Sequence, residues 1–171
     1  MEKWVIKKLY EEFIELINCP EVTKEFSVYY STIIDWVKCN KRYFNELVLR
    51  KSRLDILIKI DPNEYTVDSS ELSIEAKSFE KIKPSKIDNC AMLIGDSLWN
   101  LMIISSGKDC PVCRYNELGY ILVKFNETRE LVLECENCGW CEHLNGLKLN
   151  EEISECIPAR KKDLESYKIK P

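Results

Sequence analysis

Two closely spaced cysteine pairs constrain this chain more than any other feature of its sequence. They stand in the segments Cys110-Pro111-Val112-Cys113 and Cys135-Glu136-Asn137-Cys138. The segment 114–134 between them is long enough for a two-stranded hairpin, which would bring the two pairs together. A two-residue spacer lets both sulfurs of a tight turn point at one ion, and four thiolates suit a tetrahedral Zn²⁺. We therefore expect one structural zinc, bound by Cys110, Cys113, Cys135 and Cys138.

The residues around these pairs resemble the zinc-ribbon superfamily. The shared features are a Cys-Pro-x-Cys turn, a β-hairpin and a Cys-x-x-Cys-Gly turn, and the resemblance covers Cys110 to Trp140. Gly139 supplies the backbone freedom that a tight metal-binding turn needs. The sequence departs from the common pattern at Arg114, where a glycine is usual. The resemblance implies a hairpin held together by a metal ion.

Two further residues leave the ligand set open. Cys141 forms another Cys-x-x-Cys with Cys138, and His143, the single histidine, follows closely. We prefer Cys135 with Cys138 because Gly139 fits after that pair. The alternatives are a cluster of unliganded core cysteines or a redox pair of Cys110 and Cys113. The other four cysteines have no partner at metal-ligand spacing and are predicted to be packing residues; these are Cys19, Cys39, Cys90 and Cys156.

A closed set of four thiolates leaves no coordination position for water, so we expect the zinc to be structural and the protein not to be an enzyme. One motif offers an alternative. Glu75-Ala76-Lys77 resembles the Glu-x-Lys half of a metal-dependent nuclease site, with Asp61 as a second carboxylate. A solvated charged surface explains the same residues, because charged side chains are 32% of the chain.

The N-terminal part is predicted to be mostly helical. Apolar residues at helical spacing predict helices over Lys3–Asn18 and from Val22 to Val37, paired as a hairpin. Alternating apolar residues over Arg53–Asp61 predict a strand, with Glu46–Arg50 as its hairpin partner or a helix end. The segment Asp68–Lys83 fits either a helix capped by Asp68 or a strand, and we favour the strand.

The rest of the chain is predicted to lead into and through the ribbon. A Ser85–Asp88 capping box and helical spacing predict a buried helix over Lys86–Ile104, followed by a turn at Ser106-Gly107. Strands are expected over Tyr120–Phe125 and Glu130–Glu134, joined by Asn126-Glu127-Thr128. The fold class is therefore α+β: a mostly helical body with a small antiparallel sheet over 1–105, a zinc ribbon over 106–156 and a lysine-rich tail or short helix over 157–171.

Composition and charge bear on location and partners. No stretch of about 18 uncharged apolar residues is present and no signal-peptide core follows Met1, so we expect a cytoplasmic protein. Between Cys110 and Cys156 four basic residues face nine glutamates, a net charge of −5. A ribbon of this sign would repel a phosphate backbone, which disfavours nucleic acid as its partner.

A protein partner is the remaining expectation. The arrangement of a helical part and a ribbon ending in Cys138-Gly139-Trp140 is similar to small bacterial zinc-ribbon immunity and antitoxin proteins. This resemblance implies an acidic protein that captures a basic toxin, with Trp140 and Tyr115 as anchors and Trp99 more suited to the core. The alternatives are a nucleic-acid-binding or transcription-accessory zinc-ribbon protein, and the nuclease described above.

Overall fold

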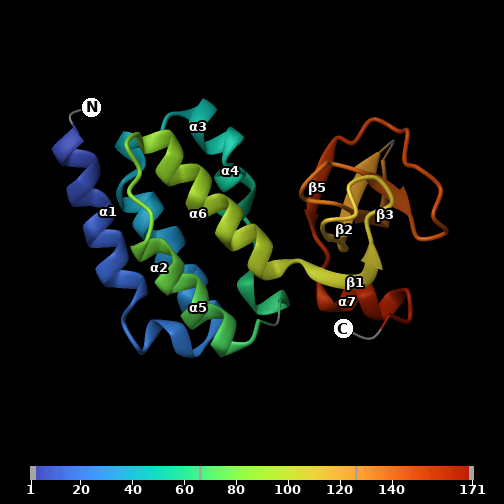
Figure 1. Cartoon of the computed structure of the whole chain (residues 1–171), viewed down its shortest axis with the longest axis horizontal. Coiled ribbons are helices and arrows are strands. Elements are labelled where there is room, and N and C mark those ends of the chain that lie inside the picture. Colours follow the sequence, from blue (N-terminus) through green and yellow to red (C-terminus); the bar gives the residue numbers. More distant parts are fainter. Residues whose placement is uncertain (1–2, 66, 126, 170–171) are drawn as a thin grey trace. The chain divides into compact units, whose positions relative to one another are not determined.

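The computed structural model describes residues 3–65, 67–125 and 127–169. The chain divides into two compact units, Met1–Leu101 and Met102–Pro171. The first unit is helical and the second is built around an antiparallel sheet, which can be followed by colour from blue and green to orange and red (Figure 1). The predicted α+β class is confirmed.

The first helices form the expected pair. Helix α1 (Lys3–Ile17) is followed by a 3₁₀ turn, η1 (Val22–Lys24), and by α2 (Phe26–Cys39). The ring of Phe13 lies 5.0 Å from that of Trp36 and 5.2 Å from that of Phe79, measured between centroids. The second helix starts later than predicted because residues 22–24 form the 3₁₀ turn.

The predicted strand over Arg53–Asp61 is wrong. After η2 (Lys41–Tyr43), the chain forms α3 (Glu46–Lys51), α4 (Leu54–Leu57) and η3 (Pro62–Glu64). The side chain of Asn45 accepts a hydrogen bond from Val48 N and starts α3. Arg53 then adopts a left-handed conformation, with φ of 59°, and redirects the chain. Leu54 and Leu57, three residues apart, are both fully buried, so the core selects the helical spacing over the alternating one.

The preferred strand within Asp68–Lys83 is also wrong, because α5 (Ser69–Glu80) occupies this segment. Asp68 caps the helix by accepting a hydrogen bond from Ser70 N. Three side chains at helical spacing are buried on its inner face: Leu72, Ala76 and Phe79.

Helix α6 (Ile87–Met102) confirms the predicted buried helix. A Cβ at Gly95 would lie only 1.8 Å from the carbonyl oxygen of Ser52. Glycine therefore permits the close approach of α6 to the end of α3. Among the described residues, no helix is both long and apolar enough to cross a membrane.

In the residues that the structure describes, the second unit contains a five-stranded antiparallel sheet around β2 (Glu117–Phe125). One edge of β2 pairs with β3 (Thr128–Glu134), which then pairs with β4 (Cys141–His143). The other edge pairs with β1 (Ile104–Asp109) and, further along, with β5 (Glu155–Pro158).

Both predicted ribbon strands are confirmed and are longer than expected. The predicted turn at Ser106-Gly107 lies inside β1, where the register shifts between Ser105 and Asp109 and Gly107 has a φ of 69°. In the hairpin turn, Asn126 lies outside the described residues.

The described part of the C-terminal segment is folded. After β5, α7 (Lys161–Ser166) begins with the carboxylate of Asp163 accepting a hydrogen bond from Arg160 N at 3.0 Å and further ones from the Arg160 guanidinium. Ala159 and Leu164 are buried and cluster with Leu131 of β3. The lysine-rich end thus contributes a strand and a short helix to the second unit, and the loose-tail alternative is wrong for these residues.

Candidate metal centre

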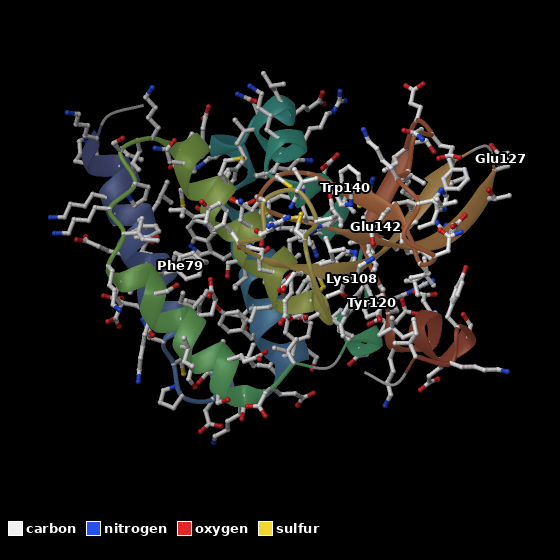
Figure 2. The ribbon with its side chains drawn as sticks, turned by 45° about the vertical axis from the view of Figure 1, so that its right-hand side comes forward. Phe79, Lys108, Tyr120, Glu127, Trp140 and Glu142 are labelled. Atoms are coloured by element: carbon white, nitrogen blue, oxygen red, sulfur yellow. The ribbon has the colours of Figure 1, made fainter. Side chains whose placement is uncertain are left out.

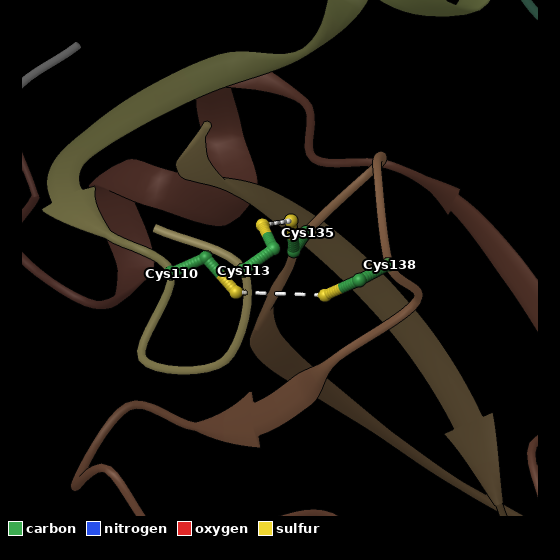
Figure 3. Close-up of side chains that lie close together, drawn as sticks. All are labelled: Cys110, Cys113, Cys135 and Cys138. Carbon is green, nitrogen blue, oxygen red and sulfur yellow. Dashed lines mark hydrogen bonds between the residues drawn. The ribbon is translucent and has the colours of Figure 1, made fainter. Parts of the chain in front are cut away.

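The structure brings all four predicted cysteines together. Cys110 follows β1 and Cys113 lies in the turn to β2, whereas Cys135 follows β3 and Cys138 lies in the turn to β4. All four Sγ atoms lie within 4.8 Å of one another. Figure 3 shows two pairs between the turns, with Sγ–Sγ distances of 3.6 Å for Cys110 and Cys138 and 3.5 Å for Cys113 and Cys135. Both turns therefore contribute to one cluster.

The spacing of the sulfurs fits a tetrahedral ion. A Zn–S bond of about 2.3 Å implies sulfur–sulfur edges of about 3.8 Å in a regular tetrahedron. The two cross-pair distances are only slightly shorter. A disulfide would need sulfurs about 2.05 Å apart, and all nine cysteines are free. The four cysteines could hold one metal ion.

The two cysteine turns share one backbone design. In the first, Arg114 N donates to Cys110 O at 3.1 Å, and in the second Gly139 N donates to Cys135 O at 2.8 Å. Each donor is the fourth residue after the leading cysteine, and each is left-handed, with φ of 56° at Arg114 and 69° at Gly139. Arg114 thus takes the place of the usual glycine without changing the turn. The departure noted in the sequence is a local backbone cost and leaves the ligand positions intact.

Backbone and side-chain hydrogen-bond donors favour the thiolate form of Cys113 and Cys110. A hydrogen bond from Tyr115 N–H, with another from the Asn137 side chain, lowers the pKa of Cys113 to about 6. Burial opposes ionisation of Cys110, but the N–H groups of Cys113 and Val112 still bring its pKa below the ordinary value. Burial raises the pKa of Cys135 to about 12. A divalent ion would favour the thiolate form at that position, because metal ligation requires deprotonated sulfur.

Apolar side chains and an ion pair that has a buried carboxylate support the two turns. Leu118 and Leu133 are buried with Cys110 and Cys135, and Trp140 packs against this cluster.

Glu142 of β4 is only 2% exposed, although it is charged. Its carboxylate pairs with Lys108 of β1 and accepts a hydrogen bond from Trp140 Nε1 at 2.9 Å. These three side chains are labelled together in Figure 2. They tie the strand before the first cysteine turn to the strand after the second.

The sequence did not point to this ion pair. Lys108 and Glu142 are far apart in the chain, and only the path of the sheet brings them together. The left-handed conformation of Arg114 could have been predicted from the sequence, because Arg114 stands at the same position after Cys110 as Gly139 does after Cys135.

The two alternative ligands lie in other environments. Cys141 and Cys156 pack against the buried cluster of Ile121, Val123, Val132 and Leu149. Burial raises the pKa of Cys141 to about 11. His143 Nδ1 lies 2.6 Å from Glu130 Oε1, and its Nε2 lies 3.7 Å from Glu151 Oε2. Within the described residues, neither side chain joins the group of four.

The residues of the nuclease alternative lie in the first unit on helical elements. Glu75 and Lys77 are two positions apart on α5, where side chains do not face each other. Asp61 caps η3 by accepting a hydrogen bond from Asn63 N. Among the described residues, no group of three or more metal-binding side chains includes Glu75 or Asp61.

The proposed contact residues also differ in exposure. Tyr115, in the first cysteine turn, is 86% exposed, whereas Trp99 is buried in the first unit and Trp140 is half-buried. Of the ribbon glutamates, Glu142 is buried in its ion pair and does not belong to the acidic surface. Glu127, Glu136 and Glu152 are exposed.

Comparisons with known proteins add no relative. Neither a family model, nor a curated protein, nor a solved structure matches this chain. The resemblance to zinc ribbons therefore rests on the four cysteines, their two turns and the strands that follow them.

Proposed function

We propose that the protein is a non-enzymatic binding module whose sheet unit is held together by one structural Zn²⁺. The convergence of Cys110, Cys113, Cys135 and Cys138 carries this proposal. Four sulfur ligands select zinc over hard cations such as Mg²⁺ and Ca²⁺. They also fill the coordination sphere, so the ion supports the fold and leaves no position for a reacting water.

Metal content and local stability test the proposal together. The full-length protein, purified under reducing conditions without chelator, should contain one zinc per chain by native mass spectrometry. Chelation should increase hydrogen exchange throughout β2 and β3, because structural zinc binding is coupled to folding. Exchange in α1 and α2 of the first unit serves as the internal control and should stay unchanged. Protein without zinc, or β2 and β3 amides that ignore chelation, would overturn the proposal.

The partner that we propose for this module is a basic protein, as for an immunity or antitoxin protein that captures a toxin. The exposed ring of Tyr115 after the first cysteine turn, and exposed glutamates of the same unit such as Glu136 in the second turn, support it. Charge complementarity of this kind mainly speeds association. Reversing Glu136 and Glu152 to lysine should reduce capture of a basic partner from the native host. Reversing Glu15 and Glu71, which are exposed on the first unit, is the matched control. Equal recovery of the same partners by both variants would refute the proposed acidic surface.

A further inference from the structure

The helical unit carries a basic surface where α2 leads into α3. Within residues 38–53 there are six basic side chains and one carboxylate, that of Glu46, so this segment has a net charge of +5. The whole chain has a net charge of −4. The six basic residues are Lys38, Lys41, Arg42, Arg50, Lys51 and Arg53. The segment therefore opposes the charge of the rest of the protein.

Four of these side chains are exposed and form no ion pair with a carboxylate of the described residues. Lys38 Nζ lies 3.5 Å from Asp35 Oδ1, and Arg53 is only partly exposed, with its guanidinium 4.5 Å from the centre of the Trp99 ring. In contrast, no carboxylate of the described residues lies within 4.0 Å of the remaining four. We call these four residues, Lys41, Arg42, Arg50 and Lys51, the α3 basic surface. Unpaired like charges on short neighbouring elements repel one another, so this arrangement does not serve stability.

The four cations lie in two pairs at the two ends of one short helix. Lys41 and Arg42 belong to η2 just before α3, and Arg50 and Lys51 stand in the last turn of α3. Six residues at 1.5 Å each make α3 roughly 9 Å long. Charges placed at both ends of such a helix suit a polymer that presents negative charges repeatedly along its length. In Figure 2, nitrogen-tipped side chains stand out from the teal ribbon of α3.

The chemistry of the surface favours nucleic acid over an acidic protein. Lysine is depleted and arginine enriched in protein–protein interfaces, whereas both residues together contact phosphates, so the two lysines are what favour nucleic acid here. Leu47 is the one large apolar side chain exposed within residues 38–53, so the surface has few anchors for a protein. The guanidinium of Arg42 lies over the ring of Tyr43 at 4.7 Å, which limits its freedom before binding.

We propose that the α3 basic surface binds the phosphate backbone of a nucleic acid. The negative charge that disfavours nucleic acid belongs to the ribbon segment, whereas this surface lies on the other unit. The proposal does not depend on zinc.

Binding can be measured with a fluorescent short DNA duplex and its RNA equivalent as probes for the full-length protein. The test variant carries Lys41→Gln, Arg42→Gln, Arg50→Gln and Lys51→Gln. The matched control carries Lys77→Gln, Lys81→Gln, Lys83→Gln and Lys86→Gln, which removes the same charge from exposed residues of the same unit. Each lost phosphate contact lowers the slope of log K against log salt by about 0.9. The slope of the test variant should therefore be shallower by up to about 3.6, and the variant should bind about a hundredfold or more weakly at low salt, whereas the control should remain close to the original protein.

Several results would overturn the proposal. One is no binding of either probe at low salt, and another is equal weakening in both variants. A third is a preference for poly-glutamate over both nucleic acids, which would assign the surface to an acidic protein. Circular dichroism should show that both variants keep their helices. The charge-preserving variant Lys41→Arg with Lys51→Arg should bind like the original, and failure of that variant would also count against phosphate recognition.

Discussion

The two cysteine turns permit a reciprocal test of why Arg114 is tolerated. Arg114 and Gly139 hold the same left-handed conformation at the same position after their leading cysteines. A side chain in that conformation costs about 1–2 kcal/mol relative to glycine, whereas glycine costs up to about 1 kcal/mol more backbone entropy on folding. At each of the two positions, the free energy of folding should therefore favour glycine over a residue with a side chain by about 0.5–1 kcal/mol.

Substitution in opposite directions should give opposite effects. Arg114→Gly should raise the local free energy of unfolding by about 0.5–1 kcal/mol because it relieves the left-handed strain. Gly139→Ala should lower it by a similar amount, since nothing lies within 4 Å of the added Cβ and no steric clash contributes. The side chain of Arg114 is exposed and forms no ion pair within the described residues, so its removal has no other large cost.

Hydrogen exchange of β2 and β3 amides is the suitable assay, because it reports on the sheet unit separately from the helical one. Gly107 provides a control of another kind: it is also left-handed, at φ of 69°, but lies in the β1 bulge outside both cysteine turns. Gly107→Ala should be destabilising without changing metal affinity. If the amides of β2 and β3 exchanged at the same rate or faster in Arg114→Gly, the two turns would not share the same left-handed strain, and the reasoning would be refuted.

Three further predictions follow from the second unit. Cys135→Ser should abolish stoichiometric zinc binding, whereas Cys141→Ser and Cys156→Ser should keep it and lose only about 1 kcal/mol of packing, as measured by native mass spectrometry and denaturation. Lys108→Met should lower the free energy of unfolding by about 2 kcal/mol, because it leaves the buried Glu142 carboxylate without its cation. Lys124→Met is the control: its partner Glu127 is exposed, so the loss should be under about 0.5 kcal/mol. Hydrogen exchange measures both losses. The hydrogen bond to Glu130 raises the pKa of His143, so its stabilising effect should be complete below about pH 6.5 and decline as the pH rises through that raised pKa. In His143→Gln this part of the pH profile should be flat.

The strongest sequence predictions were those in which spacing alone carries the chemistry. The cysteine pairs predicted a common cluster, and the structure brings the four sulfurs within 4.8 Å. The regular apolar spacing of α1 and α6 predicted long helices, and both formed. In these segments, local propensity and burial favour the same secondary structure, so the prediction needs little knowledge of the rest of the fold.

The prediction over Arg53–Asp61 failed where two periodicities overlap. Leu54, Ile56 and Ile58 alternate as in a strand, but Leu54 and Leu57 also satisfy helical spacing, and burial of that pair selects the helix. The left-handed Arg53 that permits this path has no clear signal in the sequence. Short apolar segments are ambiguous for this reason, since tertiary contacts outweigh the small differences in propensity.

The support of the metal centre depends on the sheet as a whole. In the sequence, Glu142 looks like another surface glutamate of the ribbon. In the structure, β4 places its side chain inside the unit, beside Lys108 of β1. Burial of a charge is favourable only with a well-placed partner, so the order of the strands decides whether this glutamate is a surface charge or a structural one. For the proposed basic partner, only exposed glutamates such as Glu136 and Glu152 count toward a binding surface, so the net charge of the segment overstates the charge on that surface. Charge counts along a chain therefore become arguments about partners only after the fold has removed the charges that it uses internally.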